Sequence, residues 1–211
     1  MNQINILMLK PNSILCFSLF FILNFSWAQI PEYYSSIDFE QQGVSLRVQL
    51  SNLITDTHHT FLPYTSVATD TWDVMRISDL FSENSGSVLL IYGYDDDDDD
   101  FINDRTRDVY DPCHTGWCNG KWNREHVFAR SLSNPVLTTN DPGPGTDIHN
   151  LRAADSQKNS ERSNRFFADG FGNSGIVDGG LFYPGDEWKG DVARIIMYMH
   201  LRYPGQCDAV N

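Results

Sequence analysis

The chain has 211 residues with 15 basic and 28 acidic side chains, so its formal net charge is −13. Hydrophobic residues make up 41% and aromatic residues 13% of the chain. This composition is that of a globular protein, and the length excludes two full-sized domains. The acidic balance also argues against a protein that holds a polyanion through its net charge.

The first 28 residues have the layout of a secretory signal peptide. Lys10 is their one charge, an apolar run of ten residues ends before Asn24, and small residues stand one and three positions before the expected cut after Ala28. A membrane anchor would need about 20 consecutive apolar residues. We therefore expect a secreted or periplasmic protein without a membrane segment, a single domain over residues 29–211, and a monomer.

The first half of the mature chain predicts two helices and one strand. Apolar residues recur at helical spacing over 43–57. A second helix is predicted over 70–81, with Asp70 as the candidate N-cap. An apolar stretch between glycines over 87–94 predicts a buried strand. The six aspartates 95–100 repel one another and predict a solvated, mobile loop, since a calcium loop would space its carboxylates and need glycine or asparagine for the turn.

The second half is rich in turns and shows no internal repeat. Its predicted elements are an extended segment over 122–128, a loop rich in Asn, Pro and Gly through residue 145, a helix over 147–161, a glycine-rich loop over 170–180 and an amphipathic helix over 188–202.

Three cysteines follow the signal segment. In an oxidising compartment the near pair Cys113 and Cys118 predicts a disulfide that closes a small loop, and Cys207 is left over. Cysteine and histidine are also the ligands of structural zinc sites. Cys113, His114, Cys118 and His126 could therefore form a zinc site instead.

Two short segments hold most of the reactive groups, Asn-Arg-Glu-His-Val at 123–127 and Asp-Ile-His-Asn-Leu at 147–151. Phosphodiester hydrolysis needs a base and a cation. An imidazole has an unperturbed pKa of about 6.5, so His126 is the candidate general base. Magnesium keeps most of its waters, so Glu125 and the amide oxygen of Asn150 could form a sparse ligand shell. Because successive side chains of a strand point to opposite faces, the strand must twist or end near Glu125 and His126.

Together with Arg-Ser-Asn at 162–164 and the stretch 190–199, these strings resemble the bacterial endonuclease I family of secreted or periplasmic nucleases. The resemblance implies an α+β fold with a ββα-metal, or His-Me finger, core around residues 120–165 and helices on both sides. It makes His126 the general base, and Glu125 and Asn150 the ligands of Mg²⁺ or another divalent cation. It also implies cleavage of DNA, and often RNA, with little sequence preference, leaving 5′-phosphates.

The same resemblance implies an arginine that contacts the substrate phosphate. Arg130 lies between the two motifs, and Arg124 and Arg162 are the alternatives. Residues 121–165 contain seven of the 15 basic side chains, so we expect a local basic surface that binds nucleic acid and includes Arg152. Local potential and a bound cation can outweigh an acidic net charge in this way.

Members of this family continue past the last predicted helix, so we expect that the chain lacks a further C-terminal segment. Two other classes of function compete with a nuclease. A zinc-stabilised extracellular binding module would hold one zinc ion tightly and cleave nothing. A calcium-dependent surface protein working through 95–100 would show calcium-dependent melting without catalysis.

Overall fold

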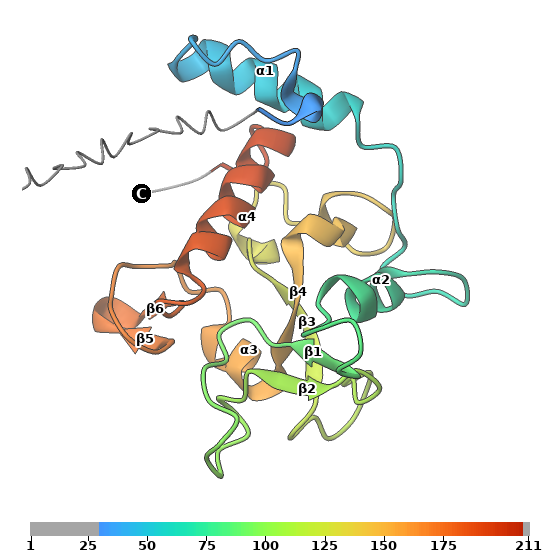
Figure 1. The fold of residues 1–211 in the computed structure, drawn as a ribbon, viewed down its shortest axis with the longest axis vertical. Helices are drawn as coiled ribbons and strands as arrows, with labels where there is room; N and C mark the ends of the chain where they lie inside the picture. Colours follow the sequence, from blue (N-terminus) through green and yellow to red (C-terminus); the bar gives the residue numbers. More distant parts are fainter. Residues whose placement is uncertain (1–29, 209–211) are drawn as a thin grey trace, which may run out of the picture. The chain divides into compact units, whose positions relative to one another are not determined.

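The computed structural model describes residues 30–208, and the predicted signal peptide lies outside these residues. Residues 30–36 belong to a separate unit with the short 3₁₀ helix η1 (Glu32–Tyr34), and the main unit begins at Ile37. In the described part, the main unit has four α-helices and three two-stranded antiparallel sheets (Figure 1). This is the α+β class that we predicted. No helix in residues 30–208 combines the length and apolarity needed to cross a membrane.

Helices α1 (Gly43–Asp56) and α4 (Lys189–Arg202) come from opposite ends of the main unit and pack against each other (Figure 1). Both confirm the predicted helices to within one residue. The apolar stripe of α1 is half-buried, and the hydroxyl of Ser51 donates a hydrogen bond of 2.6 Å to the carbonyl oxygen of Leu201. Helix α4 also contacts the chain around residue 149, so it supports the segment that carries the second motif.

Helix α2 (Thr71–Ser78) begins as predicted and ends three residues early. Its N-cap Asp70 accepts hydrogen bonds from the backbone N–H groups of Trp72 (2.7 Å) and Asp73 (3.3 Å), two of the donors that a helix N-terminus leaves unpaired.

The predicted strand over 87–94 is shorter than expected. Strand β1 (Ser87–Leu89) pairs with β2 (Thr106–Asp108). The chain then turns, because the N–H of Gly93 donates to the carbonyl oxygen of Leu90 (3.1 Å). The apolar residues that follow β1 are nevertheless buried. The sequence pattern therefore predicted the burial of this segment correctly and the length of its strand incorrectly.

The centre of the main unit is a hairpin-like pair of strands followed by a helix. Strand β3 (Trp122–His126) pairs antiparallel with β4 (Leu151–Asp155), and α3 (Ser156–Arg162) follows directly. The predicted helix over 147–161 is therefore wrong in its first half. That half forms the short 3₁₀ helix η4 (Ile148–Asn150) and β4, because pairing with β3 satisfies its backbone groups and overrides the helical preference of its alanines.

Two clusters of buried apolar side chains enclose this central unit. One lies between α2, β1 and the β3–β4 pair, and the other between β3, β4, α4 and the last sheet, β5 (Gly175–Val177) with β6 (Leu181–Tyr183), joined by the 3₁₀ helix η5 (Asp178–Gly180). Trp122 and Leu151 belong to the first cluster, Val127 and Ala154 to the second. Both sides of the β3–β4 pair are thus packed, which fixes its position.

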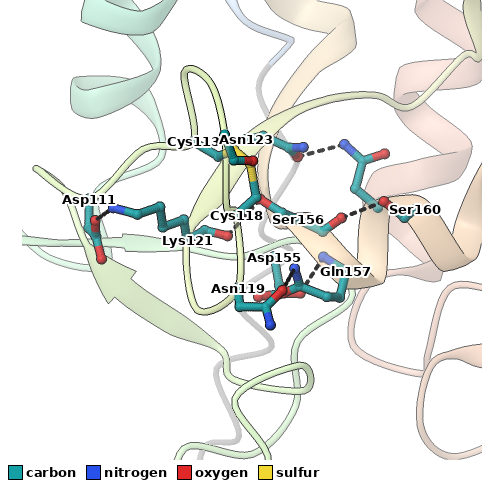
Figure 2. Close-up of a disulfide and its surroundings, with 12 residues drawn as sticks. Asp111, Cys113, Cys118, Asn119, Lys121, Asn123, Asp155, Ser156, Gln157 and Ser160 are labelled. Carbon is teal, nitrogen blue, oxygen red and sulfur yellow. Dashed lines mark hydrogen bonds and ion pairs between the residues drawn. A yellow bond between two sulfur atoms is a disulfide. The ribbon is translucent and has the colours of Figure 1, made fainter.

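The disulfide that we predicted is present between Cys113 and Cys118, whose Cα atoms lie 5.3 Å apart. Figure 2 shows it beside the start of α3, where Asn119 accepts a hydrogen bond from Gln157 (2.9 Å). Because each cysteine is bonded to the other, neither thiolate is available as a ligand for the alternative zinc site. Cys207 is buried and unpaired in the described residues.

The acidic loop is exposed over Asp96–Asp100, as predicted for a solvated segment. Its carboxylates also shape it. Asp96 accepts hydrogen bonds from the N–H groups of Arg105 (2.7 Å) and Thr106 (2.9 Å), and Asp98 accepts one from the side chain of Asn103 (2.9 Å). Asp98 and Asp100 also accept hydrogen bonds from the backbone N–H groups two residues further on, at 2.8 and 3.1 Å, and these form turns of the Asx kind.

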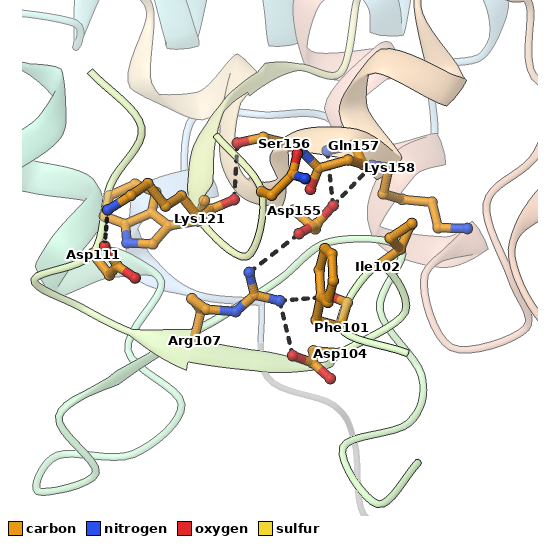
Figure 3. A network of polar contacts seen from close by, with 12 residues as sticks. Phe101, Ile102, Asp104, Arg107, Asp111, Lys121, Asp155, Ser156, Gln157 and Lys158 are labelled. Carbon is orange, nitrogen blue, oxygen red and sulfur yellow. Dashed lines mark hydrogen bonds and ion pairs between the residues drawn. The ribbon is translucent and has the colours of Figure 1, made fainter. Parts of the chain in front are cut away.

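Arg107 of β2 connects this loop to the start of α3 (Figure 3). Its guanidinium donates to Asp104 (2.8 Å) and to the carbonyl oxygen of Phe101 (2.6 Å), and on the other side to Asp155 (3.2 Å). Asp155 is the N-cap of α3. Arg107 therefore joins the segment that follows the acidic loop to the start of α3, and residues 95–100 do not line the pocket described next.

Candidate active site

The end of β3 opens into a pocket of about 480 Å³. Glu125 and His126, the last two residues of the strand, both line it. Because regular pairing ends at His126, the alternation that would send the two side chains to opposite faces does not separate them. The residues that complete the pocket come from β3 itself, from the segment after it, and from α3 and the residues that follow α3: Arg124, Ala129, Arg130, Ser131, Val136, Asn159, Arg162, Ser163 and Asn164.

The ring of His126 is held by a backbone carbonyl. Its Nε2 lies 2.8 Å from the carbonyl oxygen of Gly145, and a carbonyl oxygen can only accept, so Nε2 carries the proton and Nδ1 is the basic nitrogen. Burial lowers the pKa of His126 to about 4; the Gly145 carbonyl works against this shift and Arg130 and Arg124 add to it. The imidazole is therefore neutral at pH 7, as a general base must be.

Gly145 can play this part because it lacks a side chain. A Cβ atom at Gly145 would lie 2.0 Å from the carbonyl oxygen of Thr138, a distance that real Cβ atoms do not reach. The loop rich in Asn, Pro and Gly before β4, which includes the 3₁₀ helix η3 (Pro144–Thr146), thus brings its backbone close to itself and presents the carbonyl to His126.

Glu125 is 2% exposed, and two side chains contact its carboxylate at the same oxygen. Oε1 accepts a hydrogen bond of 2.9 Å from the hydroxyl of Tyr92 and lies 3.3 Å from Nη1 of Arg162. Burial raises the pKa of Glu125 to about 7, while Arg162 and Tyr92 oppose the rise. A buried carboxylate of this kind is stabilised by any further positive charge in the pocket.

Two asparagines could provide an amide oxygen beside Glu125, and the structure gives them different environments. Asn150 is fully buried, and its side chain bonds to both backbone groups of Phe128: Oδ1 accepts from the N–H (2.7 Å) and Nδ2 donates to the carbonyl oxygen (3.1 Å). It fixes the chain after β3 and does not line the pocket. Asn159 of α3 lines the pocket, and its Nδ2 donates to Oδ1 of Asn123 (2.7 Å). This bond orients the amide and leaves Oδ1 as an acceptor.

The sequence analysis selected Asn150 as the partner of Glu125 and did not consider Asn159, which the structure places at the pocket. A signal was present, because Asn159 and Arg162 stand three residues apart and so share a face of α3. Tyr92 was missed altogether, and no local pattern connects it with Glu125, 33 residues further along the chain.

The four predicted substrate-binding arginines have different environments. Arg124 stacks between the rings of Tyr64 and Trp72 and donates to Thr71 (2.9 Å) and Thr65 (3.1 Å), so its guanidinium is held internally. It also donates to the carbonyl oxygen of Tyr64.

Arg162 is 1% exposed and donates to the carbonyl oxygens of Val127 (2.7 Å) and His126 (3.2 Å), so it joins the end of α3 to the end of β3. Arg152 lies outside the pocket beside Asp79 (3.7 Å). Arg130, in the 3₁₀ helix η2 (Arg130–Leu132), is exposed and lines the pocket, and only its Nε is engaged, by the carbonyl oxygen of Leu137 (2.7 Å). Among these four, Arg130 is the arginine best placed to meet a ligand.

The chain is similar to known nucleases over most of its length. Residues 42–211 match the model of the family described as endonuclease I. An extracellular ribonuclease of Bacillus amyloliquefaciens is 36% identical over 171 residues, which cover 78% of this chain and 51% of the relative. An extracellular ribonuclease of Bacillus subtilis (strain 168) is 35% identical over 185 residues, covering 85% and 56%. The chain spans about half the length of these relatives, and no solved structure matches it. By the extent of the family match, the chain belongs to the endonuclease I family.

Proposed function

We propose that the protein is a secreted, metal-dependent endonuclease that hydrolyses phosphodiester bonds of DNA or RNA with little sequence preference. The observation that carries the proposal is a neutral, carbonyl-held His126 beside the buried carboxylate of Glu125 in one open pocket. The names of the two ribonucleases make RNA a substrate to test together with DNA. In this proposal β3, β4 and α3 are the ββα-metal core.

The pocket suits a hard divalent cation such as Mg²⁺. Within residues 30–208 no three His, Cys, Asp or Glu side chains form a metal-binding group, so a cation here would need amide oxygens and waters beside one carboxylate. Glu125 and Oδ1 of Asn159 provide such oxygen ligands, and magnesium commonly binds proteins in this sparse way. We propose Asn159 for this role in place of Asn150, because the amide of Asn150 is engaged with Phe128. When bound, the cation would neutralise charge on the phosphate oxygens.

The residues of the chain then have distinct roles. Nδ1 of His126 accepts a proton from the attacking water, and Gly145 keeps the other nitrogen protonated and the ring in place. Arg130 binds a phosphate oxygen of the substrate. Arg162 and Asn150 hold the backbone at the end of β3, so they position the reactive side chains without touching the substrate.

The first test uses supercoiled DNA and a structured RNA as substrates for the purified protein. The wild-type protein should cleave both with Mg²⁺ and neither in excess chelator. His126→Ala should lose at least about a hundredfold in rate and keep its affinity for nucleic acid, because only the proton acceptor is removed. A variant with nearly full rate would exclude His126 as the base, and cleavage in excess chelator would exclude the metal-dependent mechanism.

A further inference from the structure

Tyr92 has a backbone conformation that tyrosine rarely adopts. Its φ is 74°, and in residues 30–208 the other non-glycine residue with positive φ is Ser163, which lines the pocket. Tyr92 is the third residue of the turn from Leu90 to Gly93. Positive φ at that position of a turn favours glycine, because a side chain crowds the backbone there. Contacts of the Tyr92 side chain must therefore explain why tyrosine, and not glycine, occupies this position.

Packing explains the ring of Tyr92 but not its hydroxyl. The residue is completely buried, and its ring lies against Phe182 (5.1 Å between centroids) and Phe167 (6.2 Å). The hydroxyl of Ser174 donates to the backbone carbonyl oxygen of Tyr92 (2.6 Å), which holds the turn from behind. Phenylalanine would pack equally well. The hydroxyl adds one contact, the 2.9 Å hydrogen bond to Oε1 of Glu125.

That contact selects one arrangement of the Glu125 carboxylate. Arg162 also approaches Oε1, at 3.3 Å. A guanidinium facing a carboxylate without a competing donor tends to bind both oxygens in a fork. With the Tyr92 hydroxyl on Oε1, Tyr92 and Nη1 of Arg162 meet at this one oxygen, which favours Oε2 as the oxygen that meets a ligand in the pocket.

We propose that Tyr92 is a positioning residue for Glu125, which presents Oε2 to the cation; this rests on the proposed function. Residues that orient a metal ligand change metal affinity about 10- to 100-fold when they are replaced. Tyr92→Phe keeps the turn and the ring and removes the hydrogen bond. We expect it to raise the dissociation constant for Mg²⁺ by that factor, measured by titration calorimetry, and to raise the Mg²⁺ concentration at half-maximal rate by the same factor.

A matched control separates this effect from the loss of a buried hydrogen bond. Tyr183 is 2% exposed and donates a hydrogen bond of 2.6 Å to Asp186, outside the pocket. Tyr183→Phe should leave Mg²⁺ affinity unchanged. Urea unfolding of both variants shows how much stability each loses. If Tyr92→Phe binds Mg²⁺ as the wild type does, or if the two variants weaken binding equally, the proposal is overturned.

Combined variants distinguish this proposal from the proposed function. Tyr92→Phe should weaken Mg²⁺ binding further in an Asn159→Ala background and have no further effect in a Glu125→Ala background. Equal effects in both backgrounds would show that Tyr92 does not act through Glu125, and would leave the nuclease assignment intact. If Glu125→Ala alone keeps full Mg²⁺ affinity, the proposed metal site itself is wrong.

Discussion

At the residue scale, the reactivity of His126 depends on a carbonyl group 19 residues further along the chain. The bond from Nε2 to Gly145 decides which ring nitrogen carries the proton, and burial keeps the ring neutral. The choice of tautomer would be lost if the carbonyl moved, because a histidine without this acceptor could rotate or change tautomer. In the proposed mechanism Gly145 is therefore as necessary as His126.

Gly145→Ala should therefore lower the rate constant by about a hundredfold, the effect of displacing a catalytic group by about 1 Å. The new Cβ would meet the carbonyl oxygen of Thr138 at 2.0 Å, so the backbone must shift. Gly143→Ala is the control, since its φ of 170° suits any residue and its Cβ would meet nothing within 4 Å. Single-turnover cleavage rates of the two variants test the prediction, and equal rates would contradict it.

The two asparagines should also give opposite results. Asn159→Ala should weaken Mg²⁺ binding and leave the urea midpoint nearly unchanged, because its side chain lies at the pocket. Asn150→Ala should lower the free energy of unfolding by about 1–3 kcal/mol, the cost of leaving the buried backbone groups of Phe128 unpaired. Calorimetry with Mg²⁺ and urea unfolding measure the two quantities. Loss of Mg²⁺ affinity in Asn150→Ala at full stability would restore Asn150 as the ligand.

At the element scale, two capping carboxylates mark where the short helices of the segment 147–162 begin. Asp147 caps η4 and Asp155 caps α3, with β4 between them. Asp147 also ties η4 to the last helix: its Oδ2 accepts hydrogen bonds of 2.8 Å from the hydroxyls of Tyr198 and Tyr203. The second motif is thus attached to α4 through one buried carboxylate.

This carboxylate should make stability depend on pH. Burial acts to raise the pKa of Asp147, but hydrogen bonds from His149, Tyr203 and Tyr198 outweigh burial and lower the pKa to about 2. A carboxylate whose pKa is lowered by folding stabilises the protein above its unfolded pKa, near 4, and loses this contribution as pH falls to about 2. The contribution near neutral pH is about 2 kcal/mol.

Asp147→Asn removes this titration. The variant should be less stable than the wild type by about 2 kcal/mol at pH 7, and the difference should shrink between pH 4 and pH 2. Urea unfolding across this range measures it. A difference that stays constant down to pH 2 would show that Asp147 acts through packing alone.

At the scale of the whole molecule, the proposed function requires an acidic protein to bind a polyanion. The chain carries −13 overall, yet seven of its 15 basic residues lie in 121–165. Of the four arginines that we expected on the basic surface, the structure leaves one exposed at the pocket. Arg124 and Arg162 are engaged inside the protein and Arg152 lies outside the pocket, whereas Arg130 is exposed in it. The aspartates 95–100 do not line this pocket.

Arg130→Ala should therefore weaken nucleic-acid binding, and the dependence of log affinity on log salt should fall by about one, as expected when one phosphate contact is lost. Arg152→Ala should leave both unchanged. Binding at several salt concentrations, with His126→Ala protein to prevent cleavage, tests this.

The double change Asp97→Asn with Asp99→Asn should leave cleavage intact, because these exposed carboxylates lie outside the pocket. Loss of cleavage in the aspartate variant would place the loop in the site.

Local sequence was sufficient for part of this description. The helices α1, α2 and α4, the cap at Asp70 and the disulfide between Cys113 and Cys118 were all predicted, because amphipathic spacing, capping side chains and a short cysteine interval act within a few residues. The same is true of the pairing of a carboxylate with a histidine at Glu125 and His126, two adjacent residues in one motif.

Tertiary structure decided the rest. Residues 151–155 form a strand because β3, which ends 25 residues earlier, pairs with them, and such pairing leaves no mark in local periodicity. The side chain of Asn150 is hydrogen-bonded to the backbone of Phe128. The amide of Asn159 is oriented by its hydrogen bond to Asn123. Tyr92 reached Glu125 from a turn that would favour glycine. Each of these outcomes depends on a contact between residues more than 20 positions apart, whose partner is set only when the core packs and the backbone groups find their hydrogen bonds.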